Sequence, residues 1–139
     1  RAARLKQSPS VLKPATSHSM LQLMRLNVLK GTGKRAEAEG YRVGGKTGTA
    51  EKVVGRSYEG SALLNSFLAT FPTDAPEYVV LVTIDEPKRV PESHNEATAG
   101  VNAAPTVGKI VARIAPILGV APKLVGDQPK FDAKVLASY

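Results

Sequence analysis

Residues 44–52 read GGKTGTAEK, and this stretch decides how the rest of the chain is interpreted. Glycines at positions 44, 45 and 48 lie among β-forming residues between Tyr41 and Val54. Glycine inside a strand often marks a place where a ligand or another backbone comes close. Alternate side chains of a strand face the same way, so Thr47 and Thr49 are expected to share a face. The stretch therefore predicts a strand with an approachable backbone and two hydroxyls on one side.

The same residues also fit a phosphate-binding loop. Residues 40–47 read GYRVGGKT, which matches the pattern G-x-x-x-x-G-K-[ST], and Asp85 and Glu86 follow an apolar run as magnesium-binding acids do. Such a loop needs a buried strand before it and a helix after it. Residues 34–39 are polar, and Gly48 and the segment 53–55 disfavour a helix. A P-loop nucleotide-binding module is therefore the weaker interpretation.

Outward from this stretch, the pattern predicts a helix before it and two strands after it. Pro14 is suited to open the helix and Gly31 to end it, with apolar residues at helical spacing at Met20, Leu21, Met24, Val28 and Leu29. Residues 31–40 read as a loop and residues 55–62 as a turn. Residues 63–71 and 78–84 are expected to be strands, and the nearly continuous apolar run YVVLVTI indicates a central, buried one.

A second helix is predicted over residues 99–118, with Pro105 near its start and Pro116 near its end. Its apolar face would consist of Val107, Ile110, Val111, Ile114, Ile117 and Leu118. The short connections between the strands favour an antiparallel meander. The expected fold class is α+β, a three-strand antiparallel meander flanked by helices. Residues 1–120 would form the packed portion and residues 121–139 a C-terminal tail.

The amino-acid composition excludes some classes of function for this chain. The chain has 139 residues, 42% hydrophobic and 22% charged, which is typical of a packed domain or part of one. It has no cysteine, so disulfides and zinc–thiolate sites are excluded. The net charge of +7 comes from dispersed basic residues without interleaved aromatic residues, which favours a solvated surface over nucleic-acid binding. No apolar run reaches the roughly 18 residues that a membrane span needs.

Several segments together resemble one protein family. Residues 24–28, the glycine-bearing loop and residues 40–52 are similar to class B penicillin-binding proteins, in particular the division-specific peptidoglycan D,D-transpeptidase of Gram-negative bacteria. Further similarity lies in Asn65-Ser66-Phe67, in residues 78–87 and in Ala104-Pro105. The resemblance covers about residues 11–120. It implies the penicillin-binding/β-lactamase-like transpeptidase fold, with this chain supplying the third, fourth and fifth strands of a five-stranded sheet and the C-terminal helix.

The resemblance also implies a chemistry, because Lys-Thr-Gly is the third active-site motif of such serine acyl-transferases. A serine attacks a D-Ala-D-Ala stem peptide of peptidoglycan, or a β-lactam. Lys46 and Thr49 would be catalytic, with the Thr49 N–H as an oxyanion donor. Thr47, Gly48 and Thr49 would bind substrate, the two hydroxyls holding its terminal carboxylate. No metal or cofactor is implied. The expected location is the periplasmic side of the inner membrane, with an anchor upstream of this chain.

The other two family motifs are expected to lie outside this chain. Residues 10–13, SVLK, fit Ser-x-x-Lys and residues 93–95, SHN, fit Ser-x-Asn, but both are in the wrong place relative to Lys46. The isolated chain is therefore expected to be inactive. Its partners would be the rest of the transpeptidase domain, stem peptides and β-lactams, and no nucleic acid. A different interpretation is a structural or interaction fragment that self-associates through open sheet edges.

Overall fold

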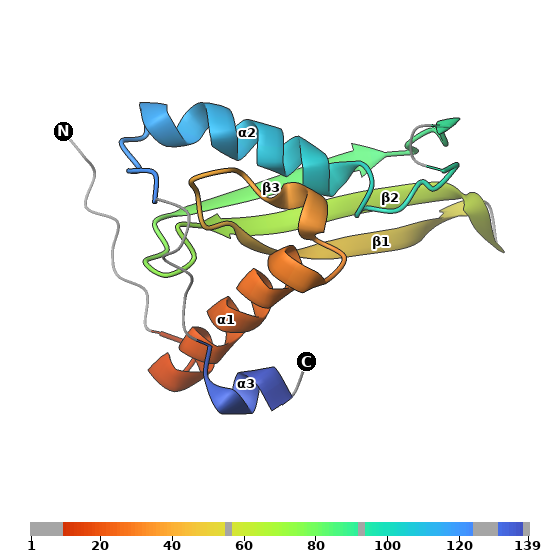
Figure 1. Cartoon of the computed structure of the whole chain (residues 1–139). Helices are drawn as coiled ribbons and strands as arrows, with labels where there is room; N and C mark the ends of the chain where they lie inside the picture. Colours follow the sequence, from red (N-terminus) through yellow and green to blue (C-terminus); the bar gives the residue numbers. More distant parts are fainter. Residues whose placement is uncertain (1–9, 55–56, 92–93, 124–130, 138–139) are drawn as a thin grey trace.

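The computed structural model describes residues 10–54, 57–91, 94–123 and 131–137, and its elements are shown in Figure 1. In chain order they are α1 (Pro14–Lys30), the short 3₁₀ helix η1 (Lys34–Ala36), β1 (Gly44–Val54), β2 (Ser57–Phe71), β3 (Tyr78–Asp85), α2 (Ala103–Ile117) and α3 (Ala133–Ala137). The three strands form one antiparallel sheet in the order β1-β2-β3. This confirms the predicted α+β class and the predicted meander.

Two expectations about the strands were wrong. Residues 57–62 do not form a turn, because β2 begins at Ser57 and residues 57–59 pair with Val54, Val53 and Lys52 of β1. β3 is not the central strand of the described sheet, because it pairs only with β2. Its side chains alternate between half-buried and exposed, and Val79 and Leu81 remain 71% and 62% exposed. The apolar run alone could not show whether one face of the strand is covered or both faces are.

The two long helices lie close to where they were predicted. α1 begins at Pro14 and ends at Lys30, with the Gly31 N–H bonded to the Asn27 carbonyl. Its buried residues are Gln22, Arg25, Leu26 and Val28, so the predicted apolar stripe was only partly right, and Met20 is exposed. α2 is capped by the Asn102 side chain, which accepts from the Ala103 N–H. None of the helices in the described residues is long and apolar enough to cross a bilayer.

The core lies between α2 and one face of the sheet, as Figure 1 shows. α2 contributes a buried stripe at four-residue spacing, Ala103, Val107, Val111 and Ala115. Phe67 and Phe71 of β2 belong to the same buried cluster. Ile117 and Leu118, which were expected on this apolar face, are exposed because the chain leaves the helix just beyond the stripe. Small core residues thus bring α2 close to the sheet.

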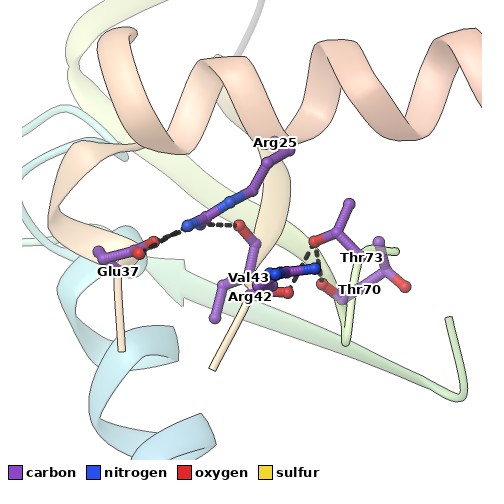
Figure 2. A network of polar contacts seen from close by, with 6 residues as sticks. All are labelled: Arg25, Glu37, Arg42, Val43, Thr70 and Thr73. Atoms are coloured by element: carbon purple, nitrogen blue, oxygen red, sulfur yellow. Dashed lines mark hydrogen bonds and ion pairs between the residues drawn. The ribbon is translucent and has the colours of Figure 1, made fainter. Parts of the chain in front are cut away.

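A polar network fixes α1 against the start of β1 (Figure 2). The buried guanidinium of Arg25 donates to both carboxylate oxygens of Glu37, at 2.5 and 2.8 Å, and to the Val43 carbonyl at 2.8 Å. The Thr73 hydroxyl, at the turn after β2, donates to the Arg42 carbonyl at 2.7 Å. The Arg25 bonds hold α1 beside Glu37 and the residue before β1, and the Thr73 bond holds the turn after β2 beside the same segment.

The region predicted as a C-terminal tail packs back onto this end of the molecule. Val135 is buried, and so is Val120, the residue just before this region. The Lys123 ammonium contacts the Asp74 carboxylate, and the Asp132 N–H donates to the Gln22 side chain of α1.

Candidate active site

β1 is an edge strand, and one side of its backbone faces away from β2. The carbonyl of Gly45 accepts from the Asn27 amide of α1 at 2.8 Å, and that of Thr47 accepts from the Lys46 ammonium at 2.7 Å. In an antiparallel ladder, the residues that point toward the neighbouring strand alternate with those that point away. The N–H and C=O groups of Thr47 and Thr49 therefore lie on the open edge, where a substrate backbone could pair with them.

Thr47 and Thr49 share the face of the sheet that also carries Phe67 and Asn65, their register partners. The Thr47 hydroxyl lies 2.8 Å from the hydroxyl of Thr32, in the loop after α1. The Thr49 hydroxyl accepts from the Ala99 N–H at 3.1 Å. The prediction that the two threonines share a face is confirmed.

The two hydroxyls line a cavity of about 450 Å³ at the open edge. Its walls come from three places in the sequence: the loop after α1, the strand β1, and the segment before α2. The lining residues are Gly31, Thr32, Lys34, Arg35, Thr47, Thr49, Glu96, Thr98, Gly100 and Val101. Both basic and acidic side chains therefore surround the two threonines.

Lys46 lies on the opposite face of β1. Its register partner is Leu68, which is 43% exposed, and its side chain turns back so that Nζ reaches the Thr47 carbonyl at the edge. The structure thus places the two predicted catalytic residues, Lys46 and Thr49, on different faces of one strand. What they share is the open edge, to which Lys46 brings a positive charge.

Packing within this chain requires glycine at position 45 and brings a side chain of β2 close to Gly48. A Cβ on Gly48 would lie 2.6 Å from the Ser66 hydroxyl of β2. A Cβ on Gly45 would lie 2.6 Å from the Leu68 carbonyl oxygen and would overlap the ring of Phe67. The close approach that the sequence predicted is therefore made by β2, and the predicted approach of a substrate to Gly48 stays a prediction.

The phosphate-loop interpretation is wrong, because Lys46 and Thr47 lie inside a strand of 11 residues. A phosphate loop needs a helix whose N-terminal amides face the ligand, and the described residues after Thr47 form β1 and then β2. The predicted magnesium acids have another role. Glu86 and Asp85 hold the Lys52 ammonium at 2.7 and 2.9 Å, and these hydrogen bonds raise the pKa of Lys52.

Two segments match the missing motifs in sequence, residues 10–13 and 93–95. None of their described residues lines the cavity. The Ser10 hydroxyl donates to the Leu12 carbonyl at 2.7 Å, and Lys13 is the exposed residue directly before α1. Ser93 lies outside the described residues, while His94 and Asn95 are exposed and have positive φ angles.

The sequence did not indicate Asn27, Thr32 or the Ala99 N–H as part of this site. Thr32 stands between two glycines and reads as a turn residue, and a backbone N–H leaves no trace in a sequence. Their contacts with β1 span 18, 15 and 50 residues, so a local pattern could not have found them.

Comparison with known proteins agrees with this geometry. The family described as penicillin binding protein transpeptidase domain matches residues 3–112. A probable peptidoglycan D,D-transpeptidase FtsI of Caulobacter vibrioides is 46% identical over 133 residues, covering 86% of this chain and 23% of the relative. The stage V sporulation protein D of Bacillus subtilis is 41% identical over 122 residues, covering 85% of this chain and 18% of its own length. The chain thus spans about a fifth of the length of these relatives.

Solved structures give the same result. The transpeptidase domain of penicillin-binding protein 3 from Burkholderia pseudomallei superposes with a TM-score of 0.73 at 34% identity, covering 85% of this chain and 34% of that one. Penicillin-binding protein 3 of Mycobacterium tuberculosis, solved with ampicillin, superposes with a TM-score of 0.70 at 23% identity. The match covers 91% of this chain and 30% of that one, and it shows a likeness in fold. With the Lys-Thr-Gly-Thr edge strand in place, these matches show that the chain belongs to the penicillin-binding protein transpeptidase family and is part of that domain.

Proposed function

We propose that this chain supplies the third active-site motif of a peptidoglycan D,D-transpeptidase whose serine nucleophile lies outside it. The observation that carries the proposal is the open edge of β1, where the Lys46 ammonium reaches the Thr47 carbonyl and Thr47 and Thr49 line a cavity. A substrate of extended backbone adds to such an edge as a further strand. The terminal carboxylate of a D-Ala-D-Ala stem would then lie beside Thr47 and Thr49, with Gly48 leaving room between them.

The reaction would proceed by acyl transfer. The serine oxygen attacks the penultimate D-alanine carbonyl, its proton passes to the departing amine, and free D-alanine leaves. An amine of a second stem attacks the acyl-enzyme and regenerates the serine hydroxyl. The Thr49 N–H, on the open edge, would stabilise the negative oxygen of each tetrahedral intermediate. Losing one such donor typically lowers the rate about 100- to 1,000-fold. Lys46 would keep the potential at this edge positive.

The uncovered face of the sheet indicates where the nucleophile would come from. Lys46 points to the face opposite α2, and on that face lie the exposed side chains of Leu64, Leu68, Val79 and Leu81. We call these four residues the apolar face. Exposed apolar patches of this kind mark contact surfaces. The rest of the transpeptidase domain, with its serine, would cover the apolar face and meet Lys46 at the edge.

The complete protein would act at cell division, on the periplasmic side of the inner membrane, where stem peptides are found. A second candidate role rests on the two edges of the described sheet, β1 and β3. Without the rest of the domain, these edges and the apolar face could pair two copies of the chain.

The test is acylation of the complete transpeptidase that contains these residues. After incubation with a penicillin, intact mass and peptide mapping should place the adduct on a serine outside this chain. Lys46→Ala should slow acylation at least about 100-fold, in the range of a lost electrostatic stabiliser. The control is Lys52→Ala on the same strand, where the ammonium is held by Asp85 and Glu86. An adduct on Ser10 or Ser93, or none at all, would refute the proposal.

A further inference from the structure

Another cavity lies beside α1, next to the turn that follows β2, and its volume is about 250 Å³. Its walls come from α1, with Leu21 and Arg25, from the turn after β2, with Thr73, and from the C-terminal segment, with Phe131. None of its described lining residues also lines the cavity at the open edge of β1. It is therefore a candidate site separate from the proposed active site.

The buried guanidinium of Arg25 has one N–H group without a partner. Its two terminal nitrogens donate to Glu37 and to the Val43 carbonyl, as Figure 2 shows. The third nitrogen, Nε, is buried as well, and no described residue accepts a hydrogen bond from it. A buried donor without an acceptor is rare and costly in a folded protein. Because Arg25 belongs to the lining of the cavity, an acceptor for Nε can come from a molecule bound there.

The other polar side chains of the lining that are not exposed already have partners. The Thr73 hydroxyl donates to the Arg42 carbonyl at 2.7 Å, and the Arg42 guanidinium donates to the Asp74 carboxylate at 2.5 Å. Both ends of the buried Gln22 amide are hydrogen-bonded. The cavity therefore offers a ligand one unmet buried donor.

The charges around the cavity are balanced. Glu37 is the partner of Arg25, and Asp74 is the partner of both Arg42 and Lys123. A carboxylate that entered the cavity would lose its hydration, while both arginines already have a carboxylate beside them. An uncharged carbonyl oxygen loses less on leaving water and needs only one donor. The polar groups therefore favour an uncharged acceptor over an anion.

We propose that this cavity binds a small uncharged amide, whose carbonyl accepts from Arg25 Nε and whose apolar group packs against Leu21 and Phe131. The cavity is at the lower end of the size range of ligand sites, so the ligand is a small one. The inference does not depend on the proposed function. Since Arg25 also holds the Val43 carbonyl, the ligand would bind at the base of the strand that carries Lys46.

The test titrates the complete transpeptidase with N,N-dimethylbenzamide, an aromatic amide that accepts hydrogen bonds but donates none. The protein is isotopically labelled at its arginine side-chain nitrogens. The quantity measured is the chemical shift of the Arg25 Nε–H signal, identified by its absence in Arg25→Lys. The signal should move saturably, with a dissociation constant in the millimolar range that is usual for so small a ligand. Benzoate has the same ring with a charged group and should bind at least about threefold more weakly.

Two variants of the C-terminal segment test the apolar wall. Phe131→Ala should weaken binding of the amide about three- to tenfold, the effect of one aromatic contact. Leu136→Ala is the matched control, because Leu136 is exposed and lies outside the lining, and it should leave the affinity unchanged. The signals of the probe itself report its affinity for these two variants. The comparison therefore stands even if Arg25→Lys does not fold.

The outcomes separate this proposal from the proposed function. The absence of a saturable shift would refute the cavity as a ligand site, and so would equal affinities of Phe131→Ala and Leu136→Ala. Tighter binding of benzoate would refute the uncharged ligand class. Enzyme acylated by benzylpenicillin should bind the amide unchanged, and a loss of binding would place the probe in the active site instead. If benzylpenicillin acylates no serine, the proposed function fails, while binding at Arg25 is still measured.

Discussion

Asn65 lies directly opposite Thr49 in the β1–β2 ladder, and it anchors the segment that reaches over to the Thr49 hydroxyl. Its amide donates to the Ala97 carbonyl and, at 3.1 Å, to Asn102 Oδ1. Two residues after Ala97, the Ala99 N–H donates to Thr49. A buried amide of β2 therefore determines where the hydrogen-bond donor to Thr49 is placed.

Asn65→Asp should be strongly destabilising. The substitution keeps the shape but places a carboxyl oxygen where the amide faces two acceptors, in a fully buried position. Losing those bonds in the interior should cost at least about 2 kcal/mol of unfolding free energy. The measurement is chemical denaturation of the complete transpeptidase. Asn102→Asp is the milder comparison and should cost less than Asn65→Asp, because it keeps the oxygen that caps α2 and loses only its own amide bond to the Ala97 carbonyl. Equal losses would argue against the anchoring role of Asn65.

Gly45→Ala should destabilise the domain far more than Gly48→Ala. At Gly45 the added methyl meets the Leu68 carbonyl and the ring of Phe67, which is fully buried, and neither can move aside. Overpacking of this kind costs about 1–3 kcal/mol or more. At Gly48 the nearest atom is the Ser66 hydroxyl, which can rotate away. Comparing the two melting temperatures checks this, and a larger drop for Gly48→Ala would contradict it.

Asp74 should contribute stability that disappears in acid. Burial would raise the pKa of this carboxyl, but the Lys123 hydrogen bond, its own backbone N–H and the Arg42 charge together hold the pKa below its usual value. A carboxyl whose pKa is lower in the folded state stabilises the fold above its unfolded pKa, about 3.9. The contribution is lost as the pH falls through the lower, folded value. The difference in stability between wild type and Asp74→Asn should therefore shrink from pH 7 toward pH 3. A constant difference would exclude this ionisation as its cause.

Leu81→Asp should impair assembly of the complete domain. Leu81 is 62% exposed in this chain and belongs to the apolar face, which the rest of the domain is proposed to cover. A charge buried there without a partner should reduce the yield of soluble protein and the fraction that binds penicillin. Ala112→Asp, on an exposed position of α2, should change neither. Full penicillin binding by Leu81→Asp would show that the apolar face is not covered there.

The sequence by itself determined the elements whose signals are local. Pro14 and Gly31 set the limits of α1, because proline suits a first helical turn and glycine a helix end. The glycines and threonines of residues 44–49 determined an edge-accessible strand with both hydroxyls on one face, since strand side chains alternate.

Tertiary structure decided what depends on distant partners. Residues 57–59 became strand because they pair with β1, and β3 kept one exposed face because the described chain supplies nothing to cover it. The hydrogen-bond partners of the Thr47 and Thr49 hydroxyls were likewise settled by folding, which places Thr32 and Ala99 beside them from 15 and 50 residues away. A hydroxyl can donate or accept equally well, so only the groups that folding places beside it determine which it does.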